Sequence, residues 1–385
     1  MTLVKCELCG SEEHSIQIHL TKAHPETTFA EYRSTFPHSP VLSDEARRRV
    51  LLRRQQDEAA KTTEESSNDK HLPLHEIFDL RSSKQTKNGR GDDIMITYFA
   101  DVDVWGDNKD YIPDIDHRYN YNLDLLKTVL MGFEINKPVY LWGHAGVGKS
   151  TLPEQICART NRPLYRVQHT DNMEEAHVVG QTLANEQGTY FEPGPLALAL
   201  KYGFVYLADE YDFAHPSIVA VYQAVLEGKS LVIKEAPSEW RIVKPHPQFR
   251  FIATGNTNGS GDDTFLYAGT KIGNAANYSR FAITCKVDYM SRDLEVATII
   301  SQGRIDKTHA EQLRDFAELI REAFDGQKIG ATIGPRELIN SAIVGALRLN
   351  FREGLRLAFV NRLSSVDAEI AEGFLTRVVE DKITL

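Results

Sequence analysis

The sequence predicts an α/β domain built on a mostly parallel sheet and followed by a helical region. Three apolar, strand-like runs alternate with helical stretches, an order typical of α/β proteins. These runs occupy residues 138–142, 204–208 and 249–254. From about residue 293 the apolar residues are spaced as in helices. The clearest helical segments are 310–324, 335–349 and 368–379. We therefore expect a sheet-containing domain over residues 73–292 and a helical lid over 293–385.

The composition is that of an ordinary globular chain, 42% hydrophobic and 25% charged. Its 385 residues allow two or three structural units at roughly 150 residues per domain. The net charge of -10 argues against a protein whose whole surface binds nucleic acid, but not against a small DNA-binding module. Because no apolar run reaches the roughly 18–20 residues of a membrane span and the N-terminus is too polar for a signal peptide, we expect a cytoplasmic protein without membrane contact.

The first segment, residues 1–38, carries a candidate zinc site. The four predicted ligands are Cys6, Cys9, His19 and His24. Two thiolates and two imidazoles suit tetrahedral Zn²⁺, and metal binding would supply the folding energy of so short a segment. His14 is a spare candidate ligand. The alternative is a disordered His-rich tail with two free thiols.

The spacing of these ligands resembles one known family of fingers. Nine residues separate Cys9 from His19, and the stretch 25–33 follows, as in the prokaryotic Ros/MucR finger. That family binds DNA. The resemblance implies that this segment contacts DNA or, alternatively, a protein.

Residues 39–72 are polar and charged and are expected to connect this segment to the main domain. Ser43 is placed to cap a helix that carries the basic cluster at 47–54. Such clusters are more often solvated helix faces than nucleic-acid contacts. Residues 62–70 have too little apolar content to pack and are typical of a linker.

Residues 143–151 match the phosphate-binding pattern G-x-x-x-x-G-K-[ST] between an apolar strand and a helix. Backbone N–H groups of such a loop wrap a phosphate, and the helix N-terminus adds a positive dipole end. We expect Lys149 to reach the β- and γ-phosphates of ATP and the Ser150 hydroxyl to ligate Mg²⁺. The alternative, a chance glycine loop, does not explain the strand and helix on either side. The predicted nucleotide-binding residues are Gly143, His144, Ala145, Gly146, Val147, Gly148, Lys149, Ser150 and Thr151.

Two further strands end in polar residues that suit ATP hydrolysis. The run 204–208 leads to Asp209, placed to hold Mg²⁺, and to Glu210, placed to polarise the attacking water as general base. The run 249–254 leads to Asn256, which is expected to position water near the γ-phosphate. The alternatives are a surface acid pair and a turn asparagine. The order of the three strands favours the catalytic interpretation.

Two arginines are candidates for contact with the γ-phosphate. Arg280 is a candidate arginine finger that acts across a subunit boundary. Arg336 opens a helix in the C-terminal region and is expected to reach the nucleotide from the lid. For each, the alternative is an ordinary solvated arginine.

The order of these motifs resembles that of the AAA+ ATPases, which have a P-loop NTPase core and a helical lid. More narrowly, the chain is similar to the MoxR branch and, within it, to the CobS-type ATPase subunits of aerobic cobaltochelatases. The resemblance covers roughly residues 74–385 and departs from the family pattern at His144, Ala145, Val147 and Ser279. The stretches that carry it are 113–119, 209–212, 222–227, 242–249, 253–257 and 266–270.

This resemblance implies a ring, expected to be a hexamer, with ATP between subunits. It implies hairpins that face the pore or a partner, which we place at about 172–195 and 230–242. It also implies a CobT-like partner with a von Willebrand A-type domain. The leading prediction is an ATPase that remodels such a partner.

Three alternatives stay open. One is a DNA-associated ATPase recruited by its finger, and another is a genuine cobaltochelatase subunit. The third is a P-loop small-molecule kinase, against which the adjacent Asp209 and Glu210, Asn256 and the lid arginine Arg336 argue.

Overall fold

The computed structural model describes residues 4–37, 39–43, 69–186, 188–259, 261, 266–267, 270–271 and 273–379. The chain divides into two units, residues 1–68 and 69–385, and each is described by itself. The expected helix after Ser43 and the basic cluster at 47–54 lie outside the described residues. Within the described ranges, none of the helices has the length and apolar character needed to cross a bilayer.

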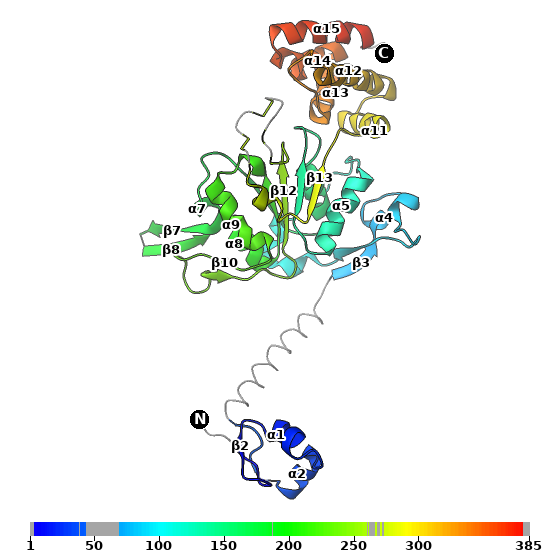
Figure 1. The fold of residues 1–385 in the computed structure, drawn as a ribbon. Helices are drawn as coiled ribbons and strands as arrows, with labels where there is room; N and C mark the ends of the chain where they lie inside the picture. The colour runs from blue at the N-terminus through cyan, green and yellow to red at the C-terminus, as the bar shows by residue number, and fades with distance from the viewer. Residues whose placement is uncertain are drawn as a thin grey trace. The chain divides into compact units, whose positions relative to one another are not determined.

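The first unit combines a minimal antiparallel hairpin with two short helices (Figure 1). Its elements are β1 (Val4–Lys5), β2 (Glu12–Glu13), α1 (Ile16–Ala23) and α2 (Phe29–Thr35). The side chains of Ser15 and Thr28 cap the two helices by accepting backbone hydrogen bonds. The buried side chains that form its small core are Val4, Cys6, Ile16, Leu20 and Tyr32.

The second unit is built on a five-stranded parallel sheet with the strand order β13-β5-β12-β9-β6. The strands are β5 (Val139–Trp142), β6 (Leu164–Gln168), β9 (Val205–Asp209), β12 (Arg250–Gly255) and β13 (Ile283–Lys286). The three runs predicted to be strands form β5, β9 and β12, so the predicted α/β fold with a parallel sheet is confirmed. Because the strands are parallel, their carboxyl ends meet at one edge of the sheet.

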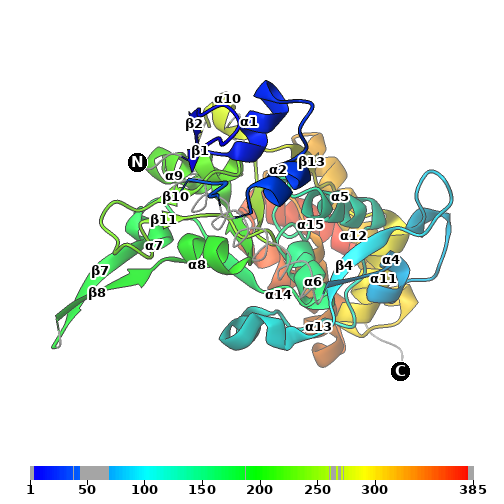
Figure 2. The same cartoon turned by 90° about the horizontal axis from the view of Figure 1, so that it is seen from below.

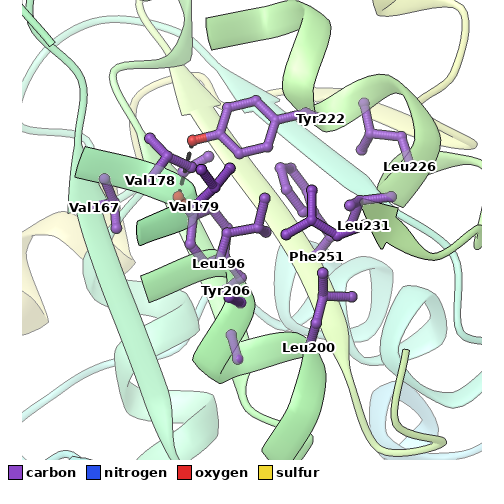
Figure 3. Close-up of a cluster of buried hydrophobic side chains, with 14 of the residues drawn as sticks. Val167, Val178, Val179, Leu196, Leu200, Tyr206, Tyr222, Leu226, Leu231 and Phe251 are labelled. Atoms are coloured by element: carbon purple, nitrogen blue, oxygen red, sulfur yellow. Dashed lines mark hydrogen bonds between the residues drawn. The ribbon is translucent and has the colours of Figure 1, made fainter. Parts of the chain in front are cut away.

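Helices cover both faces of this sheet (Figure 1, Figure 2). They are α5 (Leu123–Glu134), α6 (Thr151–Thr160), α8 (Pro195–Tyr202) and α9 (Pro216–Leu226). Alternate residues of a strand face opposite sides, so Val205 and Leu207 pack toward α5 and α6. Tyr206 and Phe251 pack on the other side, with residues of α8 and α9 (Figure 3). The result is a three-layer core.

Short elements surround this core. They are β3 (Asp69–Pro73), α4 (Leu74–Ile77), β4 (Met95–Phe99), α7 (Ala176–Val179), β7 (Gly180–Asn185), β8 (Gly188–Pro193), β10 (Leu231–Val232), β11 (Ile242–Val243), α10 (Ala275–Tyr278) and the 3-10 segments Lys84–Thr86, Val102–Tyr111, Tyr211–Phe213 and Val360–Arg362. β3 includes Asp69, four residues before the expected start of the domain, because it pairs with β4. The pairs β7–β8 and β10–β11 are antiparallel and lie where the resemblance placed hairpins.

The C-terminal region is helical, and a fully buried charge lies in its packing. Its helices are α11 (Arg292–Gly303), α12 (Lys307–Asp325), α13 (Pro335–Arg348), α14 (Phe351–Ala358) and α15 (Ser365–Val378). They share one hydrophobic core. Glu295 on α11 is 0% exposed and pairs with Arg321 at 2.7 Å and with Arg314 at 2.7 Å. These pairs tie α11 to α12.

Candidate active site

The loop 143–150 joins the end of β5 to the start of α6, at the carboxyl edge of the sheet. Gly146 and Gly148 have φ values of 79° and 91°, in the left-handed region where other residues are strained. A Cβ atom at Gly146 would also lie 3.3 Å from Cβ of Arg336. A glycine-rich turn that leads into a helix N-terminus is suited to binding phosphate through backbone N–H groups.

Lys149 is the last but one residue of this loop and is 8% exposed. Its Nζ donates to the carbonyl oxygens of Gly143 and His144, both at 2.7 Å, and to Oδ1 of Asn256 at 3.1 Å. Burial lowers the pKa of Lys149 to about 8, against the opposing effect of the Asp212 charge. An ammonium group in such a dry environment attracts a phosphate more strongly than it would in water.

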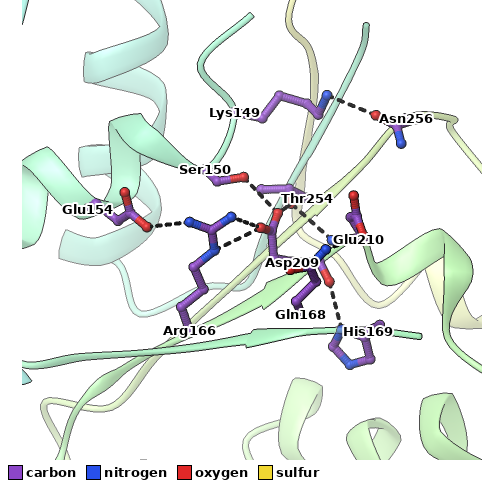
Figure 4. A network of polar contacts seen from close by, with 10 residues as sticks. All are labelled: Lys149, Ser150, Glu154, Arg166, Gln168, His169, Asp209, Glu210, Thr254 and Asn256. Carbon is purple, nitrogen blue, oxygen red and sulfur yellow. Dashed lines mark hydrogen bonds and ion pairs between the residues drawn. The ribbon is translucent and has the colours of Figure 1, made fainter. Parts of the chain in front are cut away.

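Ser150 and Asp209 meet at the base of the loop (Figure 4). The Ser150 Oγ donates to Oδ1 of Asp209 at 2.7 Å, and Oγ1 of Thr254 donates to the same oxygen. Burial alone would raise the pKa of Asp209, but the hydrogen bonds from Thr254 and Ser150 and the charge of Arg166 lower it. A hydroxyl beside an ionised carboxylate is a suitable donor set for a hydrated Mg²⁺ ion.

Arg166, which the sequence did not point to, forms part of the same network. Its Nε lies 2.9 Å from Oδ2 of Asp209, and its Nη1 lies 2.8 Å from Oε1 of Glu154 (Figure 4). Arg166 belongs to β6, which pairs with β9. The available sequence signal for Arg166 was a charged side chain within a short strand. Its partner could not be predicted, because β6 and β9 are distant in sequence and their pairing is a property of the fold.

Glu210 follows Asp209 with a left-handed backbone, φ 55° and ψ 43°. For a residue other than glycine such a conformation costs about 1 kcal/mol or more and is frequent at functional sites. Its Oε2 accepts from Nε2 of Gln168 at 2.9 Å, and its N–H donates to Oγ1 of Thr254 at 3.3 Å. One neighbouring strand therefore holds the carboxylate of Glu210, and the other holds its backbone.

Asn256 is held in place by a buried acid on the segment after β9. Oδ2 of Asp212 accepts from the backbone N–H groups of Asn256 and Thr257, at 2.8 and 2.9 Å. Burial raises the pKa of Asp212 although these hydrogen bonds oppose the shift. Asp212 thus sets the loop that places the Asn256 amide next to Lys149.

One cleft at the carboxyl edge of the sheet collects most of the predicted residues. Those that line it are Ala145, Gly146, Gly148, Lys149, Ser150, Thr151, Asp209, Glu210, Asn256 and Arg336. Arg336 reaches the cleft from the start of α13. Three residues of the predicted loop are not among the described lining residues. Val147 is buried in the core, His144 stacks on Tyr289, and the N–H of Gly143 donates to the carbonyl oxygen of Gly255 at 3.2 Å.

Arg280 lies elsewhere on the second unit. The described residues that line the cleft do not include it. Its side chain is 25% exposed, and its Nε lies 2.9 Å from Oε1 of Glu227. Within one chain, Arg280 is therefore not brought to the residues predicted to handle ATP.

In the first unit, the four predicted zinc ligands come together. The ligand atoms of Cys6, Cys9, His19 and His24 all lie within 4.8 Å of one another. Hydrogen bonding, mainly from Ser11, lowers the pKa of the Cys9 thiol to about 5. This cluster, found among the described residues, does not include His14, whose Nδ1 lies 2.9 Å from Oγ of Ser43. The arrangement offers two thiol and two imidazole donors to one metal ion.

One family model and several known proteins are similar to this chain. Residues 138–281 match the family model of the AAA domain (dynein-related subfamily). Among solved structures, the RuvB Holliday junction branch migration motor of Thermotoga maritima matches with a TM-score of 0.39 at 14% identity, over 69% of this chain and 72% of that one. An uncharacterized protein of Staphylococcus haemolyticus is 29% identical over 195 residues, 49% of this chain and 70% of that protein.

One relative is similar over most of its length. The aerobic cobaltochelatase subunit CobS of a Sinorhizobium species is 32% identical over 281 residues, which is 69% of this chain and 82% of CobS. The chain therefore belongs to the AAA+ ATPases of the CobS type.

Proposed function

We propose that this chain hydrolyses ATP within a ring of subunits and uses the resulting change of shape to remodel a protein partner. One observation carries the proposal. Lys149, Ser150, Asp209, Glu210 and Asn256 come from three strand ends and converge on one cleft. A nucleotide-binding loop, a metal-binding pair and a fixed carboxylate in one place are the parts that phosphoryl transfer to water needs.

Each of these side chains has a defined task in this proposal. The loop amides and Lys149 would bind the β- and γ-phosphates of ATP, and Ser150 with Asp209 would hold Mg²⁺, which neutralises phosphate charge when bound. Glu210 takes the proton of the attacking water, and Asn256 orients that water. Arg336 contacts the γ-phosphate from the lid.

The placement of Arg280 supports assembly into a ring. Its guanidinium lies outside the cleft of its own chain and is partly exposed. A finger that serves the next subunit has to be presented in this way. We expect a hexamer with ATP at the boundaries between subunits.

The partner is proposed from the relationship to CobS, which is named as one subunit of a larger enzyme. We propose a CobT-like protein with a von Willebrand A-type domain. The β7–β8 hairpin extends away from the sheet in both views (Figure 1, Figure 2) and carries Tyr190, which is 44% exposed. This hairpin is a candidate contact for the partner.

We further propose that Zn²⁺ binds the Cys6, Cys9, His19 and His24 cluster and that the finger recruits a target protein. Residues 4–37 carry three basic and five acidic side chains. They are Lys5, Lys22 and Arg33, and Glu7, Glu12, Glu13, Glu26 and Glu31. A net negative surface repels phosphates, so these residues favour protein over DNA as the target.

The test uses the full chain and its Glu210→Gln variant. Light scattering with and without ATP should show a ring that forms with nucleotide, and the variant should keep the ring while phosphate release is lost. A chain that stays monomeric under both conditions, or a variant that hydrolyses ATP normally, would overturn the proposal.

A genuine cobaltochelatase subunit is the second candidate, since the chain is similar to CobS over 82% of that protein. Adding this chain to the other subunits of an aerobic cobaltochelatase, in place of CobS, tests it. Cobalt insertion into the corrin ring would support this role, and its absence with ATP hydrolysis intact would favour a different partner.

A further inference from the structure

Glu227, which follows the last residue of α9, holds the guanidinium of Arg280. Its Oε1 accepts from Nε of Arg280 at 2.9 Å, and its Oε2 accepts from Nζ of Lys229 at 2.6 Å. Arg280 also donates through Nη1 to the carbonyl oxygen of Ala276. The guanidinium is therefore held from two sides, and a long, partly exposed side chain keeps one direction.

A second contact from the same helix face holds the segment that carries Arg280. Nε2 of Gln223 donates to Oδ1 of Asn277 at 2.8 Å. Glu227 is the C-cap residue of α9 and comes four residues after Gln223, so the two lie on the same side of the helix end. This side is turned toward Asn277 on α10 and toward Arg280, which lies two residues after α10 ends.

A different side of α9 is tied to the catalytic strand. Nδ1 of the buried His169 lies 2.8 Å from the carbonyl oxygen of Asp209, and its Nε2 lies 2.8 Å from the hydroxyl of Tyr222. A carbonyl only accepts, so Nδ1 carries the proton and Nε2 accepts from Tyr222. Burial lowers the pKa of His169, which keeps the ring neutral.

The hydrogen-bonded chain continues across the core. The Tyr222 oxygen lies 2.8 Å from that of Tyr206 on β9 (Figure 3). Tyr206 and Tyr222 are both fully buried. Buried polar chains of this kind hold their members in one arrangement, because breaking a link leaves an unpaired polar group. Helix α9 is thus fixed both to the metal-binding strand end and to the finger.

We propose that Glu227 is a positioning residue for Arg280 and that α9 couples the ATP site of one subunit to the finger it presents to the next. The coupling rests on the proposed function, in which Arg280 acts on the neighbouring subunit. A displacement of Asp209 on β9 would move Tyr222 through the hydrogen bonds of His169. Because Tyr222 lies on α9 and Glu227 caps the same helix, the movement of α9 would also shift Arg280. Neighbouring sites would then hydrolyse ATP in a coordinated order.

The first test compares full-length Glu227→Ala, Glu227→Gln and Lys229→Ala. Glu227→Ala should lower kcat about tenfold, with the KM for ATP and the ring size by light scattering unchanged, because Glu227 is not among the described residues that line the cleft. Glu227→Gln keeps an acceptor for Arg280 and should recover most of the activity. Lys229→Ala removes only the other ion pair of Glu227 and should match the wild type.

Mixed rings separate a positioning role from a merely structural one. Lys149→Ala chains lack a working site of their own but keep Glu227 and Arg280. Mixed with Glu227→Ala chains, they should restore phosphate release toward the wild-type rate per active site. A double variant Lys149→Ala/Arg280→Ala should restore nothing. Glu227→Ala activity that mixing does not restore would overturn the proposal.

The variants distinguish failure of the proposed role of Arg280 from failure of the positioning role of Glu227. If Arg280→Ala has the wild-type kcat in a fully assembled ring, the role of Arg280 is wrong and the coupling falls with it. If Arg280→Ala loses activity while Glu227→Ala does not, only the positioning role of Glu227 is overturned.

Discussion

The ring of His144 in the phosphate loop stacks on the ring of Tyr289, with centroids 5.6 Å apart and an interplanar angle of 9°. Tyr289 also contacts the lid. The guanidinium of Arg321 on α12 lies 3.7 Å from the Tyr289 ring centroid, and Arg321 pairs with the buried Glu295. Burial is the main reason that the pKa of His144 is lowered, so the stacked ring is neutral. The phosphate loop and the lid are therefore joined through Tyr289.

Replacing Tyr289 should weaken nucleotide binding. Tyr289→Leu removes both the ring stack and the cation–π contact, each of which is worth about 1 kcal/mol. We expect the Kd for ATP, measured by fluorescence titration, to rise about tenfold. Tyr289→Phe is the matched control, because it keeps the ring and loses only the hydrogen bond to Thr332 at 2.8 Å. Equal Kd values for the Leu and Phe variants would contradict this role.

Nucleotide affinity should depend on pH through Lys149. Its pKa of about 8 means that the ammonium form is complete well below pH 8 and is lost as the pH rises through that value. ATP binds the charged form, so the Kd should increase between pH 7 and pH 9, approaching tenfold per unit above the pKa. Lys149→Arg stays charged over this range. If it binds ATP, its profile should be flat, and a parallel rise in both proteins would assign the pH effect to another group.

Thr254 connects the two acids of the site and should be needed for hydrolysis. Its hydroxyl donates to Asp209 and accepts from the N–H of Glu210. Thr254→Val keeps the shape but removes both bonds, so kcat should fall at least about tenfold, a barrier change of about 1.4 kcal/mol. Without this donor the pKa of Asp209 rises, and the acid limb of the rate profile should move to higher pH. Thr254→Ser, which keeps the oxygen, should retain activity.

Residues on one face of the sheet show which parts of the site could be predicted from the sequence. Asp209 could be predicted because an acid at the end of an apolar strand is a local pattern. Arg166 and Thr254 could not, because each lies on a different strand and meets Asp209 only through the strand order β12-β9-β6. That order is not contained in any local stretch. Gln168 was missed for the same reason, since it lies opposite Asp209 only in the register of β6 and β9.

The arginines illustrate a second limit. Arg336 was predicted to reach the nucleotide from the lid, and it lines the cleft because α13 begins beside Gly146. Glu227 gave no sequence signal as a partner of Arg280, because 53 residues separate the two. Helix periodicity places Gln223 and Glu227 on one face, but it does not say what that face contacts. Such contacts follow from packing rather than from spacing.

Removing the proposed zinc should affect the first unit alone. Among the described residues of this unit, five buried side chains form the core, so the metal would supply most of its folding energy. Cys9→Ser should lose the zinc, and residues 4–43 should become sensitive to proteolysis. ATP hydrolysis should be unchanged, because the second unit has hydrophobic cores of its own.

The readouts are zinc content per chain, limited proteolysis and phosphate release. His14→Ala is the matched control, since this imidazole lies outside the ligand cluster found among the described residues. A Cys9→Ser protein with as much zinc as the His14→Ala protein would show that the four side chains are not the metal site.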